Sequence, residues 1–443
     1  MNKKKIVFLG AGYVGVWAYR SLLRALRFSN VWEQVHITAI SPLSHHLFHG
    51  WTGEVLGGII PPQHRMSPLS AILKRASLIQ GQVLCVDLKN KVIVVQTVDS
   101  KKQIFAEYDH LIFGTGSSDN KERIPGVSRC GWALKSQDDF EVFRRHLLSV
   151  LKDSNESNDA HLQKRLLTFV IVGAGFTGVE MCASISELLQ RVRMDYPVLL
   201  HRKPKIVLVH SGNHILPQLQ PKFTKIASYA EKQLLNYGVE IKCGRFLKEV
   251  TRTAAILNDG TEIPSATVLC TLGQVITPIR GTEELPQSRT GRIVTDSNLN
   301  VKGYPELWAG GDVAEVLNTH SGEFCHPNAL WAIEHGKRIG NNIARVILGK
   351  MPKAFSSRGL GQAASLGIFK GAGELWGFQF TGWLAWILRI VFFLWFMPSR
   401  RQAIKVAWTW FVFPFQGMKP QAKMLRREEP NIPGVLPVAV GLE

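Results

Sequence analysis

Residues 6–15, Ile-Val-Phe-Leu-Gly-Ala-Gly-Tyr-Val-Gly, and residues 169–180, Phe-Val-Ile-Val-Gly-Ala-Gly-Phe-Thr-Gly-Val-Glu, each place an apolar strand before a glycine-rich turn. A helix-compatible run follows each turn. In such a turn the first glycine makes the tight strand-to-helix connection. The second lets the backbone approach a pyrophosphate at the helix N-terminus, and the third lets helix and strand pack closely. Two turns of this kind in one chain predict two bound dinucleotides.

The two turns predict an α/β protein with two Rossmann-like dinucleotide-binding domains. A chain of 443 residues is long enough for two or three domains. We expect a discontinuous FAD-binding domain at 1–118 and 274–350, and an NAD(P)H-binding domain at 119–273. A C-terminal amphipathic helical membrane-associating region should occupy 351–443. FAD together with NADH or NADPH is the simplest pair of dinucleotides, and it predicts hydride chemistry.

Apolar periodicity predicts the elements between the turns. Residues 92–98 and 108–113 are expected to be strands, and residues 138–151 and 329–348 are expected to be helices. The polar stretch 152–160, rich in Ser, Asn and Asp, predicts a loop.

Charge and tryptophan gather near the C-terminus. The chain carries a net charge of +19, and residues 336–443 hold 15 Lys and Arg against four Asp and Glu. The same stretch contains six of the twelve tryptophans. Cations that flank apolar, Trp-rich runs are typical of an anionic membrane surface, whereas nucleic-acid binding usually needs a dense basic stripe. We therefore expect a membrane surface as partner and no nucleic acid.

Two apolar runs in this region, 382–397 and 406–415, are expected to be helices, the second broken by Pro414. Sixteen residues span about 24 Å at 1.5 Å per residue, less than the roughly 30 Å of a hydrocarbon core. The first run also carries Arg389 in its middle. These features favour helices that lie in the membrane interface. The alternatives are a core or dimer helix, and a true span that begins near Trp376.

The cysteines and the N-terminus exclude other classes. No two of the six cysteines form a CxxC pair, so we expect no metal site and no thiol pair for passing electrons. The cations at 3–5 precede an apolar run that Gly10 interrupts at once, so we expect a first strand and no signal peptide. The predicted location is peripheral (monotopic), on the cytoplasmic face of a membrane.

An acid normally ends the second strand of a dinucleotide unit, where it holds a ribose hydroxyl. In the first unit Ser41 is the only polar candidate, and in the second unit the position holds His210. Loss of a carboxylate removes repulsion against a 2′-phosphate, and Arg202, Lys203 and Lys205 lie just upstream of His210. The sequence therefore permits NADPH as well as NADH. The alternative is that these cations form an ordinary solvated loop.

In order along the chain, a set of motifs resembles the flavoprotein pyridine-nucleotide oxidoreductases, and within them type II NADH dehydrogenase, the single-subunit NADH:quinone oxidoreductase. Besides the two turns, the motifs are His46-Leu47-Phe48, Gly114-Thr115-Gly116-Ser117, Ile124-Pro125-Gly126, His214-Ile215-Leu216-Pro217 and Gly310-Gly311-Asp312. The resemblance covers nearly the whole chain.

The resemblance implies roles for residues at matching positions. Glu180 would orient the nicotinamide against the flavin; the alternative is an ordinary acid in the first turn of a helix. Asp312 would bind the flavin side of FAD; the alternative is a helix cap. The cofactor-binding set would be Gly10, Ala11, Gly12, Gly15, Ser41, His46, Thr115, Gly116, Gly173, Gly175, Phe176, Gly178, His210, Gly311, Asp312 and Ala329.

The predicted quinone site departs from the family pattern. The quinone-site helix of the family, which follows the Gly-Gly-Asp motif, usually starts with Ala-Gln and has a Gln-Gly one turn or more further on. Here Leu330 and His335 stand at those positions. A quinone needs donors for its carbonyl oxygens, and of this pair His335 can donate whereas Leu330 cannot.

The resemblance implies a FAD-dependent NAD(P)H dehydrogenase that reduces a membrane quinone without pumping protons, and a homodimer. One alternative is a FAD-dependent NAD(P)H reductase with a soluble protein acceptor, which the basic surface would suit. The other is a non-catalytic membrane-associated flavoprotein that acts as a redox-responsive binding module, as the missing ribose acids and Leu330 suggest.

Overall fold

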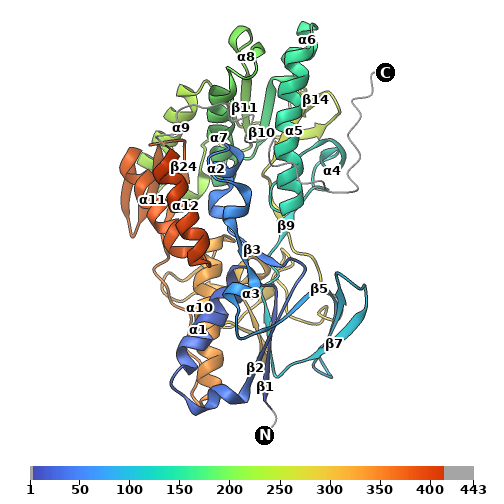
Figure 1. Cartoon of the computed structure of the whole chain (residues 1–443), viewed down its shortest axis with the longest axis vertical. Helices are drawn as coiled ribbons and strands as arrows, with labels where there is room; N and C mark the ends of the chain where they lie inside the picture. The colour runs from blue at the N-terminus through green and yellow to red at the C-terminus, as the bar shows by residue number, and fades with distance from the viewer. Residues whose placement is uncertain (1–2, 414–443) are drawn as a thin grey trace.

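The computed structural model describes residues 3–413 of the chain. Figure 1 shows two lobes stacked along the long axis, with a third group of elements, residues 362–412, against one side of both. The predicted α/β architecture with two Rossmann-like units is confirmed. The part of the expected C-terminal region at 414–443, which includes Pro414, lies outside the described residues.

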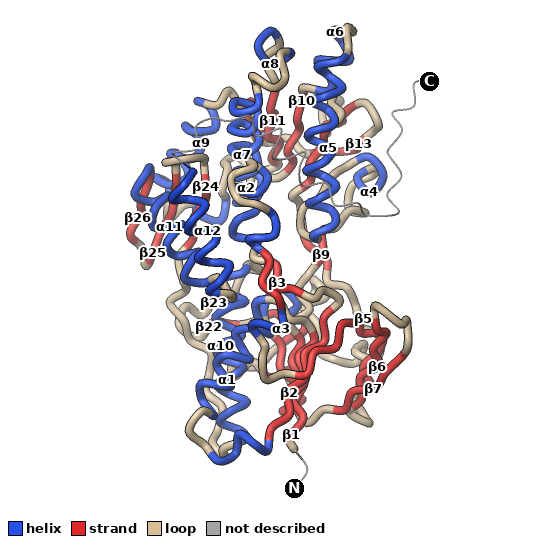
Figure 2. Tube along the Cα trace, in the orientation of Figure 1, coloured by secondary structure: helices blue, strands red, loops and turns tan. Residues whose placement is uncertain are grey.

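The first lobe is built on a twisted sheet of eight strands, drawn in red in the lower half of Figure 2. The strands are β1 (Lys4–Leu9), β2 (Val35–Ser41), β5 (Ser77–Asp87), β6 (Val92–Thr97), β7 (Gln103–Glu107), β8 (His110–Phe113), β19 (Asn300–Val301) and β20 (Tyr304–Ala309). Their order is β19-β20-β8-β1-β2-β5-β6-β7. Strands β20, β8, β1, β2 and β5 pair in parallel, so the central strands are apolar and buried on both faces.

Two helices cover one face of this sheet, α1 (Tyr13–Leu26) and α10 (Ala329–Ile347). They come from opposite ends of the discontinuous unit and pack backbone against backbone. A Cβ on Gly336 would lie 2.5 Å from the Val14 carbonyl oxygen, and one on Gly340 would lie 2.1 Å from that of Ala18. Glycine at these two positions therefore allows the close crossing.

The second lobe carries a four-stranded parallel sheet of β10 (Thr168–Val172), β11 (Lys205–His210), β12 (Glu240–Cys243) and β16 (Thr267–Cys270). The strand order is β12-β11-β10-β16. Its longer helices are α5 (Gln137–Glu156), α7 (Phe176–Val192) and α9 (Thr224–Asn236). A small antiparallel sheet of β13 (Leu247–Val250), β14 (Ala254–Leu257) and β15 (Glu262–Pro264) extends it.

The chain passes from the first lobe to the second and back through two short strands. These are β9 (Ser118–Asp119) and β17 (Gln274–Val275), which pair antiparallel between the lobes. One further segment of the first unit reaches the second lobe: η2 (His49–Trp51) and α2 (Thr52–Leu56) pack with its core. Helix α2 lies beside α7, where a Cβ on Gly53 would meet the Ser184 hydroxyl at 2.7 Å.

The third group is a three-stranded antiparallel sheet followed by two helices. The elements are β24 (Gln362–Ser365), β25 (Gly371–Leu375), β26 (Phe378–Thr381), α11 (Gly382–Phe396) and α12 (Arg400–Val412). Figure 1 shows α11 and α12 side by side along the flank that both lobes share. Within residues 3–413, no helix has the length and apolar character that crossing a membrane requires.

The remaining described elements are short. They are η1 (Asn30–Gln34), β3 (His45–Leu47), η3 (Pro62–Arg65), β4 (Met66–Pro68), α3 (Leu69–Ile72), α4 (Val127–Cys130), α6 (Ala160–Leu166), α8 (Val198–His201), η4 (Pro217–Leu219), β18 (Ile293–Val294), η5 (Gly311–Val313), β21 (Ala314–Glu315), β22 (Leu317–Asn318) and β23 (Glu323–Phe324).

The predicted loop at 152–160 is wrong for its first half, because α5 continues to Glu156. Although residues 152–156 are mostly polar, this part of α5 has one buried face. Ser154 is fully buried and its hydroxyl donates to the Leu151 carbonyl, so the helix keeps one side against the core through Val150, Leu151 and Ser154. The helix expected at 406–415 begins earlier, since α12 starts at Arg400, and positions 414–415 lie outside the described residues. The other expected helices and strands begin and end within a few residues of the observed ones.

Candidate functional site

The first glycine turn joins β1 to α1 and has one open position. Gly10 has φ +95°, and a Cβ there would lie 2.5 Å from the Gly114 carbonyl oxygen. A Cβ on Gly15 would lie 2.3 Å from the Gly10 carbonyl oxygen. A Cβ on Gly12 would meet only the Gly114 oxygen, at 4.0 Å. Gly10 and Gly15 therefore build the turn, and Gly12 leaves space in front of the amide groups that open α1.

The second turn, between β10 and α7, repeats this arrangement. Gly173 has φ +103°, and a Cβ on Gly178 would lie 1.8 Å from the Gly173 carbonyl oxygen. A Cβ on Gly175 would approach nothing closer than the Gln218 side chain at 3.3 Å. Phe176 begins α7 and is partly buried against the core of the second lobe. Both turns thus present a free helix N-terminus to a phosphate.

Asp312, in η5 directly after β20, belongs to a polar cluster with Ser117 and Lys135. Its Oδ2 atom accepts from Lys135 Nζ at 2.8 Å and from the Ser117 hydroxyl at 2.8 Å. Nearby Gly116 has φ +73° and open space at its Cβ position, and Thr115 is exposed. The sequence predicted Asp312, Thr115 and Gly116 but missed Lys135, whose partner lies 177 positions away.

His46 lies beneath the first turn and is only 2% exposed. Its Nδ1 atom lies 3.3 Å from the Ala11 carbonyl oxygen, and burial lowers the pKa of the ring to about 4. The ring is therefore neutral with the proton on Nδ1, because a carbonyl can only accept. Nε2 is then a buried acceptor without a partner among the described residues. Ser41 is also buried, and its hydroxyl accepts from the Leu43 amide at 3.2 Å.

His335 lies inside the first lobe and is 2% exposed. Its Nδ1 atom accepts from the Gly311 amide at 3.0 Å, and burial lowers the pKa of the ring to about 3. Leu330 and Ala329, in the first turn of α10, are partly exposed, and Leu330 packs on the core of the first lobe. The two predicted quinone residues therefore differ in setting: Leu330 lies near the surface, whereas His335 supports the backbone of Gly311.

His210 ends β11 and lies at the same sheet edge as the second turn, because Gly173 donates from its amide to the Val209 carbonyl. The upstream cations lie at the opposite edge. Strand β11 runs parallel to β10 with Lys205 opposite Thr168, the first residue of β10, and Lys205 pairs with Glu240 at 2.7 Å. The idea that these cations could approach a 2′-phosphate is therefore wrong, since nucleotides bind at the carboxyl ends of such strands.

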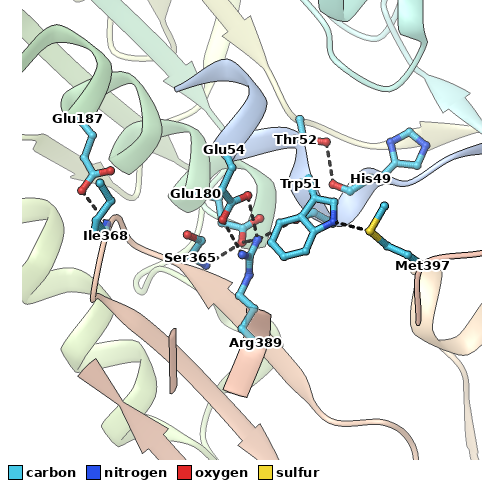
Figure 3. Close-up of polar contacts among 11 residues, drawn as sticks. His49, Trp51, Thr52, Glu54, Glu180, Glu187, Ser365, Ile368, Arg389 and Met397 are labelled. Carbon is cyan, nitrogen blue, oxygen red and sulfur yellow. Dashed lines mark hydrogen bonds and ion pairs between the residues drawn. The ribbon is translucent and has the colours of Figure 1, made fainter. Parts of the chain in front are cut away.

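Glu180, in α7, joins a buried ionic network that links three parts of the chain (Figure 3). Its Oε1 atom accepts from the Ser365 amide at 2.7 Å and lies 3.4 Å from Arg389 Nη2. Arg389 Nη1 lies 2.6 Å from Glu54 Oε1, and Nη2 donates to the Gly50 carbonyl at 2.8 Å. The side chains of Arg389 and Glu54 are 2% and 4% exposed, and that of Glu180 is 20% exposed.

This network changes the interpretation of α11. Burial raises the pKa of Glu180 to about 7, although Arg389 and the Ser365 amide pull it down. The cation in the middle of α11 faces inward to two carboxylates, whereas the sequence indicated only a charge that disfavours a span. The sequence did not identify Glu54 as part of the site. Its one local signal is an acid inside an otherwise apolar, glycine-rich segment at 50–60.

Metal chemistry has no evident ligand set in the part of the chain that the structure describes. No three His, Cys, Asp or Glu side chains there gather closely enough to hold a metal ion. The buried cysteines Cys182 and Cys270 have pKa values raised by burial, Cys270 to about 12. They are poor nucleophiles in that state.

Comparison with known proteins gives a consistent result. A family model described as pyridine nucleotide-disulphide oxidoreductase matches residues 4–329. The type II NADH:quinone oxidoreductase Ndh of Mycobacterium tuberculosis is 27% identical over 427 residues, covering 93% of this chain and 88% of that protein. A probable NADH dehydrogenase of Dictyostelium discoideum is 26% identical over 418 residues, covering 93% of this chain and 89% of that one.

Among solved structures, NDH2 from Plasmodium falciparum in complex with NADH superposes with a TM-score of 0.84. The superposition covers 94% of this chain and 99% of the Plasmodium chain at 16% sequence identity, so the two proteins share the fold. A water-forming NADH oxidase from Lactobacillus brevis superposes less completely, with a TM-score of 0.65 over 84% of this chain and 75% of that one. The third group of elements extends beyond the family match, which ends at residue 329.

Proposed function

The chain belongs to the pyridine nucleotide-disulphide oxidoreductase family, and we propose that it is a FAD-dependent NADH dehydrogenase that passes two electrons to a membrane quinone. The observation that carries the proposal is the pair of glycine turns, each with an open second glycine, Gly12 and Gly175. The relatives named as NADH:quinone oxidoreductases support the choice of donor and acceptor.

The first lobe has the features that FAD needs. Gly12 leaves room for a pyrophosphate at the N-terminus of α1. The unpartnered His46 Nε2 is a buried acceptor that suits a hydroxyl of the cofactor. The Asp312 carboxylate, steadied by Lys135, supplies a second acceptor. When bound, the flavin supplies the two-electron chemistry by which hydride leaves the nicotinamide and electrons reach the quinone.

The residues of the chain align and shield the reacting rings. We propose that Gly175 and the N-terminus of α7 bind the nicotinamide cofactor's pyrophosphate, and that Glu180, four residues into that helix, lies beside the nicotinamide ring. His335 holds the Gly311 amide, and so fixes the backbone next to Asp312. His210 stands where a carboxylate would repel a 2′-phosphate; it brings no negative charge, and burial lowers the pKa of its ring. The proposal therefore includes NADPH as a second donor.

The acceptor is proposed to be a lipid quinone because α11 and α12 present an apolar surface. We call it the apolar face. Its side chains are 40–69% exposed: Trp383, Leu384, Ile387, Leu388, Val391, Trp395, Ile404, Trp408 and Phe411. Arg400 and Arg401, at the start of α12, are exposed beside it. Tryptophan and cations around an apolar patch suit an anionic membrane surface. The proposal also includes a homodimer and a location on the cytoplasmic face.

The proposal is tested by anaerobic titration of the purified protein with NADH and then with a short-chain quinone. NADH is expected to bleach the visible flavin band, and the quinone is expected to restore it. A protein without a flavin, or a flavin that neither NADH nor NADPH bleaches, would favour the non-catalytic binding module. Bleaching that no quinone reverses, but that a ferredoxin-like protein does, would favour the soluble acceptor.

Removal of apolar side chains from the apolar face is expected to release the protein from anionic vesicles. Trp395→Ser with Ile404→Ser removes two exposed side chains, each worth about 1.5–3 kcal/mol when buried. Vesicle affinity should therefore fall at least about 100-fold, as measured by co-sedimentation. The control is Phe105→Ser, an equally exposed aromatic on β7, which should leave vesicle binding unchanged. Equal binding of both variants would contradict the assignment.

A further inference from the structure

The ionic network of Figure 3 shares one cation unequally between two carboxylates. Arg389 Nη1 lies 2.6 Å from Glu54 Oε1, whereas its closest approach to Glu180 is 3.4 Å from Nη2. The arginine is further fixed by the Gly50 carbonyl, which accepts from Nη2 at 2.8 Å. Glu54 and Gly50 therefore draw the guanidinium toward α2 and away from α7.

Glu180 is consequently not the principal partner of Arg389. Its shortest contact is the Ser365 amide at 2.7 Å, and its side chain is the most exposed of the three, at 20%. The charges that act most strongly on Glu180 are those of Arg389 and Glu54. Burial raises its pKa to about 7; Arg389 lowers this value and Glu54 raises it.

Other charged groups lie on the elements around this network. On α7, Glu187 pairs with Arg191 at 3.5 Å and accepts from the Ile368 amide at 2.8 Å. Glu374 on β25 accepts from the Gly377 amide at 3.3 Å. On α12, Arg400 lies over the Trp395 ring, and Arg401 and Lys405 complete the charges of that helix.

We propose that Glu54 is a positioning residue for the quinone half-reaction: it takes the shorter of the two ion pairs of Arg389, which leaves Glu180 in the longer one and available as an acid–base group. This inference rests on the proposed function. Reduction of a quinone to a quinol takes up two electrons from the reduced flavin and two protons. A protonated Glu180 gives one proton as its O–H bond breaks and an O–H bond forms on the quinone oxygen. Water supplies the second and re-protonates the carboxylate.

Two substitutions should move the titration of Glu180 in opposite directions. In Glu54→Gln the negative charge is lost and Arg389 is free to approach Glu180, so Glu180 should lose its proton at lower pH. In Arg389→Met the cation is lost and Glu54 remains, so Glu180 should keep its proton to higher pH. An opposite charge within about 4–6 Å typically moves a carboxyl pKa by about one to three units.

Two measurements on the full chain with FAD bound determine the pH at which Glu180 ionises. The first is the carboxyl C=O stretch in pH-difference infrared spectra, assigned by its disappearance in Glu180→Gln. The second is the pH profile of re-oxidation of the NADH-reduced protein by a short-chain quinone. In the wild type, re-oxidation should slow as pH rises through the infrared midpoint. Both midpoints should fall by at least about one pH unit in Glu54→Gln and rise in Arg389→Met.

The matched control is Glu187→Gln, a partly buried acid on the same helix that has its own arginine partner. It should leave both midpoints unchanged. The inference would be overturned if Glu54→Gln had the same midpoints as the wild type. It would also be overturned if the midpoints of Glu54→Gln and Arg389→Met shifted in the same direction. If Glu54→Gln is insoluble, Glu54→Asp takes its place: the shorter side chain holds Arg389 less closely, so both midpoints should fall, and unchanged midpoints would overturn the inference. A wild type that no quinone re-oxidises overturns the proposed function, whereas the infrared midpoints still report on Glu54.

Discussion

Gly12→Ala is expected to yield a folded protein that loses most of its flavin during purification. The new Cβ would meet only the Gly114 carbonyl oxygen, at 4.0 Å, and the backbone at φ −77° and ψ −155° is accessible to alanine. The methyl group would, however, fill the space in front of the α1 N-terminus where we place the pyrophosphate. Each charge-assisted hydrogen bond lost there costs about 1.5–3 kcal/mol. The affinity for FAD should therefore fall at least about 100-fold.

The measurement is the ratio of visible flavin absorbance to protein after gel filtration, followed by titration of the stripped protein with FAD. The comparison is Gly15→Ala, whose Cβ would lie 2.3 Å from the Gly10 carbonyl oxygen and so must distort the turn itself. Gly15→Ala should lower the melting temperature, and Gly12→Ala should not lower it beyond the effect of flavin loss. A Gly12→Ala protein that retains one flavin per chain would rule out our placement of FAD.

Gly175→Ala is expected to keep the flavin but to need a much higher NADH concentration for its reduction. The nearest atom to the new Cβ would be Gln218 Nε2 at 3.3 Å, the end of a flexible side chain that can move aside. The fold should therefore tolerate the change, whereas the pyrophosphate of the nicotinamide cofactor would be displaced from the α7 N-terminus. The KM for NADH should rise about 30- to 100-fold, which corresponds to roughly 2–3 kcal/mol.

Stopped-flow bleaching of the flavin at increasing NADH concentration measures this effect directly. Re-oxidation by quinone should be unaffected once the flavin is reduced chemically, and this separates the two half-reactions within one variant. Gly178→Ala provides the contrast, because its Cβ would lie 1.8 Å from the Gly173 carbonyl oxygen and the turn could not close. An unchanged KM in Gly175→Ala would place the donor elsewhere.

Local chemistry explains what could be predicted from the sequence. The glycine turns depend on backbone conformations and close approaches within about ten residues, so the local sequence is enough to identify them. Gly10 and Gly173, for example, both have a positive φ, which glycine adopts readily. The buried parallel strands β1 and β10 appear as continuous apolar runs for the same reason.

Partners distant in the sequence explain what could not be predicted. Arg389 lies 335 positions from Glu54 and 209 positions from Glu180 in the sequence. The sequence around Arg389 therefore could not show that its side chain points into the protein toward these two carboxylates. Lys135 reaches Asp312 across 177 positions. The misassigned start of the 152–160 segment has a related cause, since Ser154 is polar in the sequence but buried by tertiary packing.

The paired strands β9 and β17 determine how the two lobes could turn against each other. Taken alone, a two-strand crossing is a natural hinge, because few backbone hydrogen bonds resist its rotation. Helix α11 adds a second tether on the flank: Arg389 contacts Glu180 of one lobe, and Arg20 of the other donates to the Pro398 carbonyl just beyond the helix. Together with η2 and α2, which pack with the core of the second lobe, these attachments oppose rotation about the crossing. Because rotation about the two-strand crossing would have to break these contacts, we expect the lobes to keep their relative placement while donor and acceptor bind.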